Sequence, residues 1–281
     1  METEKWRVPS DRLPPRPQSA LKQAELVKTL DMLKKGGIIE PSQASHYSQV
    51  LLVPKPDGSF RMCINYITLN ACTPDVSFPI TNIRQLFVRM GTKEPFIFGV
   101  MDLTQGYHQA PLTFATRAFT EFITFCGVYQ FTRLPFRLKQ APSYFQEMMV
   151  TIVLTGLKYH ICEMYIDDCI AHGNTDGEFV SRLRSIFERF RLHSLFLKAS
   201  KCKFGYSELD FVGKIISEEG LQMSHTRIQS VLDFSVPVYA KHLKSFLGTV
   251  NYFRDFIRNQ SSLVHLLHEL IADYHKTRKM Q

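Results

Sequence analysis

The sequence contains no run of about 20 apolar residues, the length that a membrane-spanning helix needs, so we expect no contact with a membrane. Its first residues, Met1-Glu-Thr-Glu-Lys5, are polar and no apolar segment follows them, so we also expect no secretory signal. Six cysteines, at positions 63, 72, 126, 162, 169 and 202, form no C-x-x-C pair. Reduced intracellular thiols are therefore expected rather than disulfide bonds or a zinc site.

What the sequence does contain is enough apolar material for a large core. Of its 281 residues, 44% are hydrophobic and 12% are aromatic, which excludes a disordered chain. The net charge of +8 is unevenly distributed: residues 178–281 carry 16 basic and 10 acidic side chains, against 18 and 16 in residues 1–177. A basic C-terminal third suits a surface that follows nucleic-acid phosphates, although solvated helix faces are often basic too.

Two adjacent carboxylates, Asp167 and Asp168, lie between apolar, strand-like runs in residues 160–172. This pattern predicts a tight β-hairpin. Acids at a hairpin tip are commonly plain turn residues. In such apolar surroundings, however, the pair is costly unless a cation neutralises it, and carboxylate oxygens suit Mg²⁺ or Mn²⁺.

A third carboxylate, Asp102, ends the apolar run Phe96–Met101 and is followed by Gly106 and Tyr107. Two divalent cations roughly 3.5–4 Å apart are the usual device for in-line phosphoryl displacement, and they need several acidic ligands. Together with the string Tyr165-Ile-Asp-Asp168, these residues predict a polymerase-like constellation.

Residues 36–256 resemble the reverse transcriptase domain of gypsy-type LTR retrotransposons and, more distantly, of retroviruses. Six strings carry the resemblance, in the order that the family has them: Leu52-Val-Pro-Lys-Pro-Asp-Gly-Ser-Phe-Arg61, Met101-Asp-Leu-Thr-Gln-Gly-Tyr-His-Gln109, Leu134-Pro-Phe136 with Gln140-Ala-Pro142, Tyr165-Ile-Asp-Asp168, Lys201-Cys-Lys-Phe-Gly205 and Ser245-Phe-Leu-Gly-Thr-Val-Asn-Tyr-Phe253.

The resemblance implies an α+β fold, a polymerase right hand with β-rich fingers, an antiparallel-sheet palm that carries the Tyr-Ile-Asp-Asp string, and the start of a helical thumb. We expect an extended arm over residues 1–17, fingers and palm over 18–240 with a core at about 37–217, and the start of the thumb with a basic tail over 241–281. It further implies an RNA-directed DNA polymerase, a nucleotidyltransferase of a retrotransposon that is located in a cytoplasmic retroelement particle. Its partners would be an RNA or DNA template with a primer, and deoxynucleoside triphosphates.

The same resemblance implies roles for single residues. Asp102, Asp167 and Asp168 would be catalytic and would hold two Mg²⁺ (or Mn²⁺) ions, within the motif that Tyr165 and Ile166 begin. Tyr107 would lie beneath the sugar of the incoming nucleotide and exclude a 2′-hydroxyl, or else be a plain core residue. The expected nucleotide-binding residues are Lys55, Arg61, Tyr107, Phe136 and Gln140.

Local patterns predict the elements that carry these residues. We expect helices over 18–35, from a cap at Ser143 to 157, after a capping box at Thr175–Glu178, and over 240–257. Strand runs at 50–53 and 60–66 predict a hairpin, and 112–131 is β-rich with a turn at Cys126-Gly127. The resemblance to the family places the primer grip over 209–216. The polar tail after Leu270 is expected to fray.

The chain departs from the family at three positions. Arg137 stands where the family usually has Gly, and Asn65 and Ile67 replace the usual Asp and Arg. We expect Arg137 to obstruct the site. These departures keep open a second reading, a catalytically degenerate reverse-transcriptase-like fragment that only binds RNA or RNA–DNA duplex. A metal-dependent nuclease is a third reading, which explains neither Tyr107 nor the fingers strings.

Overall fold

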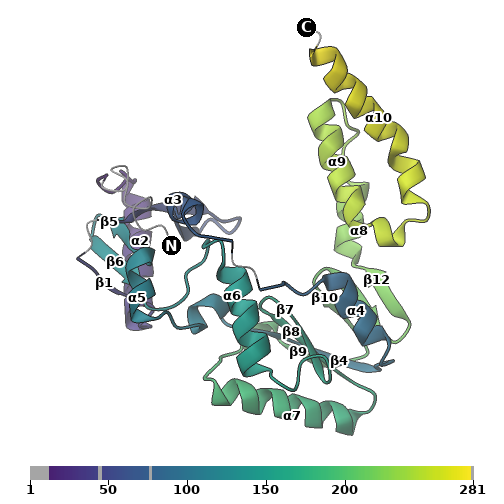
Figure 1. Cartoon of the computed structure of the whole chain (residues 1–281), viewed down its shortest axis with the longest axis horizontal. Coiled ribbons are helices and arrows are strands. Elements are labelled where there is room, and N and C mark those ends of the chain that lie inside the picture. Colours follow the sequence, from purple (N-terminus) through teal and green to yellow (C-terminus); the bar gives the residue numbers. More distant parts are fainter. Residues whose placement is uncertain (1–12, 44–45, 76–77, 280–281) are drawn as a thin grey trace. The chain divides into compact units, whose positions relative to one another are not determined.

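The computed structural model describes residues 13–43, 46–75 and 78–279, with side chains as far as Ala272, in two compact units that meet between Gly205 and Tyr206. The elements of both are drawn in Figure 1. Residues 1–12 of the expected arm lie outside the described residues, and 13–17 have no regular structure. None of the described helices is long and apolar enough to cross a membrane.

The first unit begins with helix α2 (Ala20–Lys35), which buries Leu26, Leu30 and Leu33 as their spacing predicts and ends at Gly36. It packs on a mixed five-stranded sheet of order β1-β6-β5-β2-β3, in which β2 and β5 are parallel and the other printed pairs antiparallel. The strands are β1 (Ile39–Pro41), β2 (Ser48–Pro54), β3 (Phe60–Ile64), β5 (Phe122–Thr124) and β6 (Gly127–Phe131). This module matches the β-rich fingers expected from the sequence.

Strands β2 and β3 form the predicted hairpin, whose turn closes with a 3.0 Å bond from Gly58 N–H to the Lys55 carbonyl. Gly58 has φ +78°, a value that favours glycine. Short helices connect this sheet to the rest of the unit: α3 (Ile67–Ala71), α4 (Ile83–Gly91) and α5 (Phe114–Arg117), with 3₁₀ helices η2 (Gly106–Gln109) and η3 (Ala118–Thr120). The segment 112–131 is thus less β-rich than its sequence indicates, although its turn lies at 125–126, next to the expected place.

A second sheet has four strands in the order β7-β8-β4-β9. Its strands are β4 (Ile97–Asp102), β7 (Cys162–Tyr165), β8 (Asp168–Gly173) and β9 (Lys203–Tyr206), and β8 pairs antiparallel with both β7 and β4. Helices α6 (Ala141–Met148) and α7 (Asp176–Leu192) supply the side chains that cover one face, in a core that includes Met101, Phe145 and Ile186. Helix α4 meets this sheet through the ion pair of Arg89 with Glu163 on β7.

The helix expected from a cap at Ser143 starts elsewhere, so that prediction was wrong. Helix α6 already begins at Ala141, with Pro142 in its first turn, and its N-cap is Gln140. Proline fits the first turn because its missing N–H has no helical acceptor there. Beyond Met148 the helix widens into a π-helical turn, η4 (Met149–Val153), in which Met149 and Val153 are buried and Ile152 is 56% exposed.

Helix α7 has the predicted N-terminus. The Thr175 hydroxyl accepts a hydrogen bond from Glu178 N–H at 3.2 Å, and Glu178 accepts one from Asn174 N–H at 2.7 Å. This arrangement resembles a capping box, except that the Glu178 side chain bonds the N–H of Asn174, one residue before the N-cap, and not the N–H of Thr175 itself. Helix α7 ends at Leu192, and the 3₁₀ helix η5 (Ala199–Lys201) follows it in the chain before strand β9.

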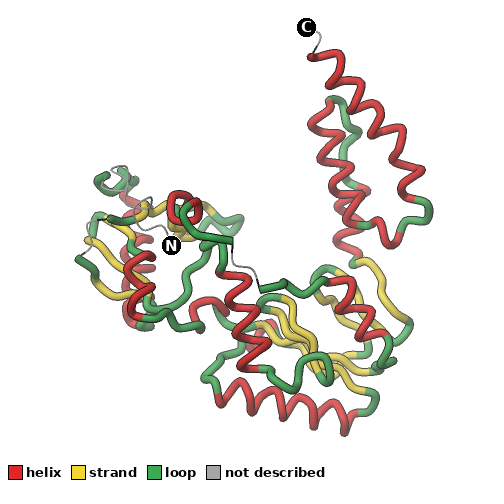
Figure 2. The backbone as a smooth tube through the Cα atoms, in the orientation of Figure 1, coloured by secondary structure: helices red, strands yellow, loops and turns green. Residues whose placement is uncertain are grey.

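The second unit contains an antiparallel sheet followed by helices (Figure 2). Its elements are β10 (Glu208–Phe211), β11 (Lys214–Ser217), β12 (Gly220–Met223), α8 (His225–Leu232), α9 (Ala240–Tyr252), the 3₁₀ helix η6 (Arg254–Phe256) and α10 (Gln260–Lys279). The expected fraying after Leu270 is wrong, because α10 continues to Lys279. Leu247 of α9 and Val264 and Ile271 of α10 are buried together, which gives the second helix a reason to form.

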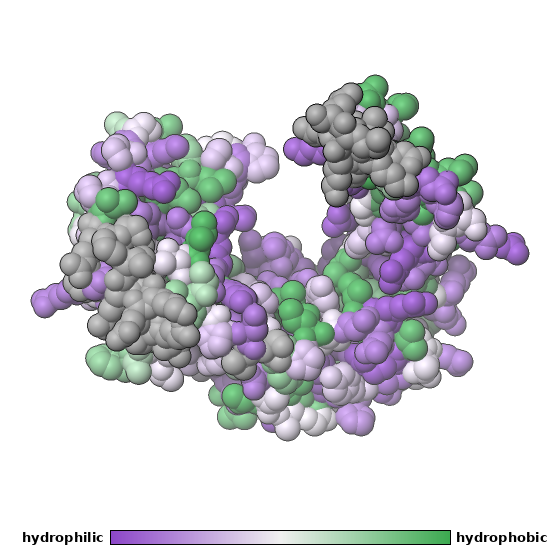
Figure 3. Space-filling view, turned by 45° about the horizontal axis from the view of Figure 1, so that its top comes forward, coloured by the Kyte–Doolittle hydropathy of each residue, from purple (hydrophilic) through white to green (hydrophobic). Residues whose placement is uncertain are grey.

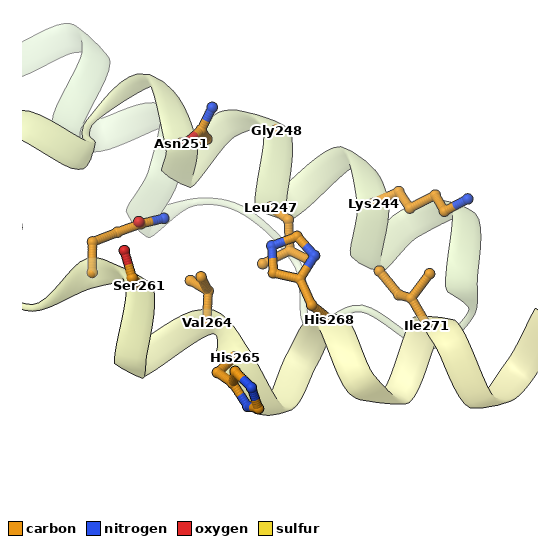
Figure 4. Close-up of a pocket in the computed structure, with 10 residues that line it drawn as sticks. Lys244, Leu247, Gly248, Asn251, Ser261, Val264, His265, His268 and Ile271 are labelled. Atoms are coloured by element: carbon orange, nitrogen blue, oxygen red, sulfur yellow. The ribbon is translucent and has the colours of Figure 1, made fainter.

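A cavity of about 580 Å³ remains between α9 and α10, and Figure 4 shows His268 pointing from α10 toward Leu247 of α9. Its lining includes Lys244 and two histidines but no carboxylate.

Hydrophilic residues are interspersed with hydrophobic ones over the face shown in Figure 3. Residues 206–281 carry 9 basic and 8 acidic side chains, so most of the positive charge of the last third belongs to residues 178–205 in the first unit.

Candidate active site

Three carboxylates meet at one end of the four-stranded sheet. Strand β4 ends at Asp102 and β8 begins at Asp168, and these two residues are direct cross-strand partners. Tyr165, the last residue of β7, pairs with Asp168, so that Ile166 and Asp167 form the two-residue turn between the strands. The predicted hairpin and the predicted approach of Asp102 to it are both confirmed. Directly opposed residues have Cβ atoms about 4.5–5.5 Å apart, which brings the two carboxylates within interaction range.

The turn is held by a residue that the sequence did not reveal. Ile166 has φ +58°, a conformation that a β-branched residue rarely adopts. Its N–H donates a 2.7 Å hydrogen bond to Oε1 of Gln146, whose side chain is completely buried on α6. The one signal in the sequence for this contact is that Gln146 is a polar residue among the apolar residues of the predicted helix.

The carboxylates interact electrostatically. Burial, together with the smaller effects of the charges of Asp167 and Asp102, raises the pKa of Asp168 to about 6, whereas Lys201 acts in the opposite direction. Nζ of Lys201 lies 2.9 Å from Oδ2 of Asp102, and this bond raises the pKa of Lys201. Lys201 belongs to a string that carried the family resemblance, but its contact with Asp102 was not predicted.

The carboxylate oxygens of Asp102, Asp167 and Asp168 suit a hard divalent cation, although the three side chains do not converge on one point that could hold it. Among the side chains that the structure describes, those of residues 13–43, 46–75 and 78–272, no group of three or more Asp, Glu, His or Cys is placed to hold a metal ion. Asp102 forms an ion pair with Lys201. Because the carboxyl groups repel one another, a cation that binds between them has to replace the neutralising effect of Lys201.

Near Asp167, Tyr107 packs with Phe136 and Phe145 in an aromatic cluster that is called the aromatic wall below. The ring of Tyr107 packs edge-on against Phe136 at 5.1 Å and against Phe145 at 5.3 Å. Burial raises the pKa of Tyr107 to about 12, with a smaller contribution from the charge of Asp167. A Cβ added to Gly106 would lie 3.4 Å from the Cβ of Asp167, so glycine allows the segment to approach the turn closely. The structure therefore places Tyr107 near Asp167, with Phe136 packed against its ring.

The loop between Phe136 and α6 is tied to helix α3. Arg137 has φ +73°, its carbonyl accepts a 2.9 Å bond from Nδ2 of Asn70, and Lys139 N–H donates at 2.8 Å to Oδ1 of Asn70. The Gln140 side chain donates to the carbonyl of Pro74. Gln140 is thus engaged with the segment after α3 rather than with the acids.

Lys55 and Arg61, the expected triphosphate ligands, both belong to the β2–β3 hairpin. Arg61 is exposed and lies opposite Val53 in the register, and Lys55 is half-buried in the turn. Neither has a hydrogen bond or ion pair with Asp102, Asp167 or Asp168, all of which are among the described residues. The structure thus leaves these two cations apart from the carboxylates.

Comparison with known proteins identifies the family. Residues 53–216 match the sequence profile described as reverse transcriptase (RNA-dependent DNA polymerase). The chain belongs to the reverse transcriptase family. The Tf2-3 and Tf2-7 transposon polyproteins of Schizosaccharomyces pombe are each 31% identical to it over 237 residues, 84% of this chain and 18% of each polyprotein. The chain thus spans less than a fifth of the length of these curated retrotransposon relatives.

Solved structures agree on the fold. A foamy viral protease–reverse transcriptase in complex with double-stranded DNA superposes with a TM-score of 0.80 at 22% identity, covering 95% of this chain and 48% of that one. The same viral protein in complex with an RNA/DNA hybrid gives a TM-score of 0.76 at 23% identity, covering 94% and 36%. The right-hand polymerase fold expected from the sequence is therefore confirmed.

Proposed function

We propose that this chain is the catalytic reverse transcriptase domain of a retrotransposon, which adds deoxynucleotides to a primer 3′-hydroxyl under the direction of an RNA template. The observation that carries the proposal is the meeting of Asp102 with the Asp167-Asp168 turn beside Tyr107. Membership of the reverse transcriptase family supports it. A binding module would need neither the clustered acids nor the aromatic wall.

Asp102, Asp167 and Asp168 would hold two Mg²⁺ or Mn²⁺ ions, with Asp102 and Asp167 as shared ligands and Asp168 as support. When bound, such ions lower the pKa of the primer hydroxyl and stabilise the charge that develops on the triphosphate. The charges of Asp167 and Asp102, which add to the effect of burial in raising the pKa of Asp168, would also attract the ions. In their absence, Lys201 neutralises part of that charge at Asp102.

The remaining predicted residues would position the nucleotide. The Tyr107 ring, fixed by Phe136 and Phe145, would lie beneath the sugar and exclude a 2′-hydroxyl by its bulk. Lys55 and Arg61 would meet the triphosphate when the hairpin that carries them closes, since cations there neutralise the leaving pyrophosphate. Gln140 would act through the loop that it ties to Pro74.

A template annealed to a primer and deoxynucleoside triphosphates are the proposed partners. The foamy viral relatives, solved with double-stranded DNA and with an RNA/DNA hybrid, support a duplex ligand. The test is primer extension on poly(rA)·oligo(dT) with Mg²⁺ and Mn²⁺ tried separately. We expect extension by the wild-type chain and none by Asp102→Asn, at equal duplex affinity. Extension that survives Asp102→Asn would refute the assignment.

The binding-only function remains a second candidate because Asn65, Ile67 and Arg137 depart from the family pattern. It predicts that the wild-type chain binds the same duplex with normal salt dependence but extends no primer with either cation. The extension and binding measurements together separate the two functions.

A further inference from the structure

Three polar side chains from distant segments are linked in series to the turn that carries Asp167. Gln146 accepts the hydrogen bond of Ile166 N–H with Oε1, and its Nε2 donates at 3.4 Å to Oγ1 of Thr81. The same hydroxyl oxygen accepts a 3.1 Å bond from Nζ of Lys158. Lys158 is 5% exposed, and Gln146 is completely buried. The side chains of Lys158, Thr81 and Gln146 thus form a hydrogen-bonded series, the Lys158 relay, that ends at the turn.

The relay permits one orientation of the Gln146 amide. The two groups at its ends, the N–H of Ile166 and the ammonium group of Lys158, can only donate hydrogen bonds. Between them, the Gln146 carbonyl oxygen accepts from Ile166, and the Thr81 oxygen accepts from both Lys158 and the amide nitrogen of Gln146. A hydroxyl oxygen has the two lone pairs that this requires. Without the Thr81 hydroxyl, the Gln146 amide nitrogen would lose its acceptor, and the amide would no longer be held toward Ile166.

Lys158 is buried at a cost that an ion pair does not offset. Among the described residues, no carboxylate forms an ion pair with it. Its Nζ contacts the Thr81 hydroxyl and lies 4.6 Å from the centroid of the Tyr159 ring. Since burying a cation without a counter-ion is unfavourable, an apolar side chain of similar length would fill this position with less loss of stability. The ammonium group therefore calls for a role other than packing.

The loop that carries Lys158 is fixed in an unfavourable conformation. Tyr159 has φ +72°, a value that residues with a Cβ rarely adopt. The guanidinium of Arg89 lies 4.7 Å from the centroid of the Tyr159 ring, and Lys93 donates a hydrogen bond to the Tyr159 carbonyl. Strained backbone of this kind persists where surrounding contacts over-determine it. These contacts keep the loop in the position from which Lys158 reaches Thr81.

We propose that Thr81 and Lys158 are positioning residues for nucleotide addition: they orient Gln146 and, through it, hold the Ile166-Asp167 turn in the geometry that presents Asp167 to the metal ions. This inference rests on the proposed function, which makes Asp167 a shared metal ligand. Thr81 precedes α4 and Lys158 precedes β7, so neither belongs to the strands that carry the carboxylates. A network that served only the stability of the fold would lower the Tm and leave kcat of the folded chain unchanged.

The first measurement is amide hydrogen exchange at Ile166 in the metal-free chain, which requires no activity. Thr81→Val removes the hydroxyl with little change of shape, and Lys158→Met removes the ammonium group but keeps an unbranched side chain. Each should speed exchange at Ile166, and Thr81→Ser should restore the wild-type rate. Thr151→Val is the matched control, because the Thr151 hydroxyl donates to the Glu147 carbonyl, and it should leave exchange at Ile166 unchanged.

The second measurement is steady-state primer extension on poly(rA)·oligo(dT) over a range of Mg²⁺ concentrations. Thr81→Val and Lys158→Met should each lower kcat by about tenfold, which is roughly 1.4 kcal/mol in the barrier. Both should raise the Mg²⁺ concentration at half-maximal rate and leave duplex affinity unchanged. The double variant should be no slower than the slower single variant, because both substitutions act through the same amide. Thermal melts confirm that each variant folds.

Wild-type exchange at Ile166 in Thr81→Val would overturn the proposal. So would a kcat that Thr81→Val leaves unchanged, a kcat as low in Thr81→Ser as in Thr81→Val, or losses that multiply in the double variant. If Lys158→Met does not fold, the two substitutions of Thr81 decide alone. A wild-type chain that extends no primer would refute the proposed function, whereas the exchange rates would still show whether Thr81 and Lys158 hold the turn.

Discussion

Replacing Asp168 with asparagine should make the metal-free protein more stable while removing its proposed activity. Asp168 is held with its pKa raised to about 6 by burial and by Asp167 and Asp102, which means that its charged form is disfavoured in the folded state. Asparagine has nearly the same shape and no charge. The variant therefore loses a source of repulsion that the folded chain otherwise tolerates.

The magnitude follows from the shift. A rise from 3.8 to about 6 is roughly two pKa units, and each unit corresponds to about 1.36 kcal/mol, so the upper limit is about 3 kcal/mol. Because Asp168 is only partly buried, solvent screening reduces the expected gain to about 1–2 kcal/mol. For a unit of this size that corresponds to an increase in Tm of roughly 2–8 °C.

The sign depends on pH. Below about pH 3.8 the carboxyl is protonated in both the folded and the unfolded chain, so wild type and Asp168→Asn should have similar stability. As pH rises, the unfolded chain releases this proton before the folded chain does, and wild type loses stability relative to the variant. The difference should reach its full size above about pH 6 and then stay constant.

The assay is thermal unfolding in EDTA between pH 4 and pH 8, with Glu188→Gln on the exposed face of α7 as the control for losing one acid. Adding Mg²⁺ should raise the Tm of wild type more than that of Asp168→Asn, since the ion stabilises only a state that binds it. A variant that is equally stable or less stable than wild type at pH 8 would show that the carboxylates are not in the strained, charged arrangement argued above.

Three further outcomes are expected. Tyr107→Ala should raise incorporation of ribonucleotides relative to deoxyribonucleotides, measured by competitive primer extension; a mutant that loses solubility with no change in this ratio would make Tyr107 a core residue. Arg89→Met should lower the free energy of unfolding by about 3 kcal/mol in urea, because Glu163 is then left buried and unpaired; a loss below about 1 kcal/mol would contradict this. Gln146→Leu should cost about 1–3 kcal/mol and slow extension at unchanged duplex affinity, since Ile166 N–H loses its acceptor; extension at the wild-type rate would show that the turn does not need it.

The predictions that held were those that local sequence could make. The apolar runs on both sides of Asp167 and Asp168 allow only strands joined by a short turn, and the pairing with β4 then brings Asp102 opposite Asp168. The leucine spacing in α2 and the capping residues at Thr175 depend on contacts within one or two turns of helix. Apart from the pairing of β4 with β8, which joins distant parts of the chain, these features are encoded within about ten residues of where they occur.

The predictions that failed involve choices that local sequence leaves open. Ser143 and Gln140 are both acceptable at a helix start, and the position of Pro142 decided between them. The polar end of the chain indicated fraying, yet α10 continues because Val264 and Ile271 pack on α9. Neither the widening of α6 into a π-helical turn nor the reach of Lys201 to Asp102 has a local pattern.

At the site itself, the backbone conformation of three residues could not be predicted from the local sequence. Gln105, Arg137 and Ile166 all have positive φ, although none is glycine, and all lie in segments next to the carboxylates or the aromatic wall. A turn built from such residues is not stable by its own propensity. Two of the three are held by side-chain amides of distant helices: Gln146 accepts a hydrogen bond from Ile166 N–H, and Asn70 donates one to the Arg137 carbonyl. The geometry of the site is therefore set by residues that carry no chemistry, and substitutions at these amides should disturb it as much as changes in the turns themselves.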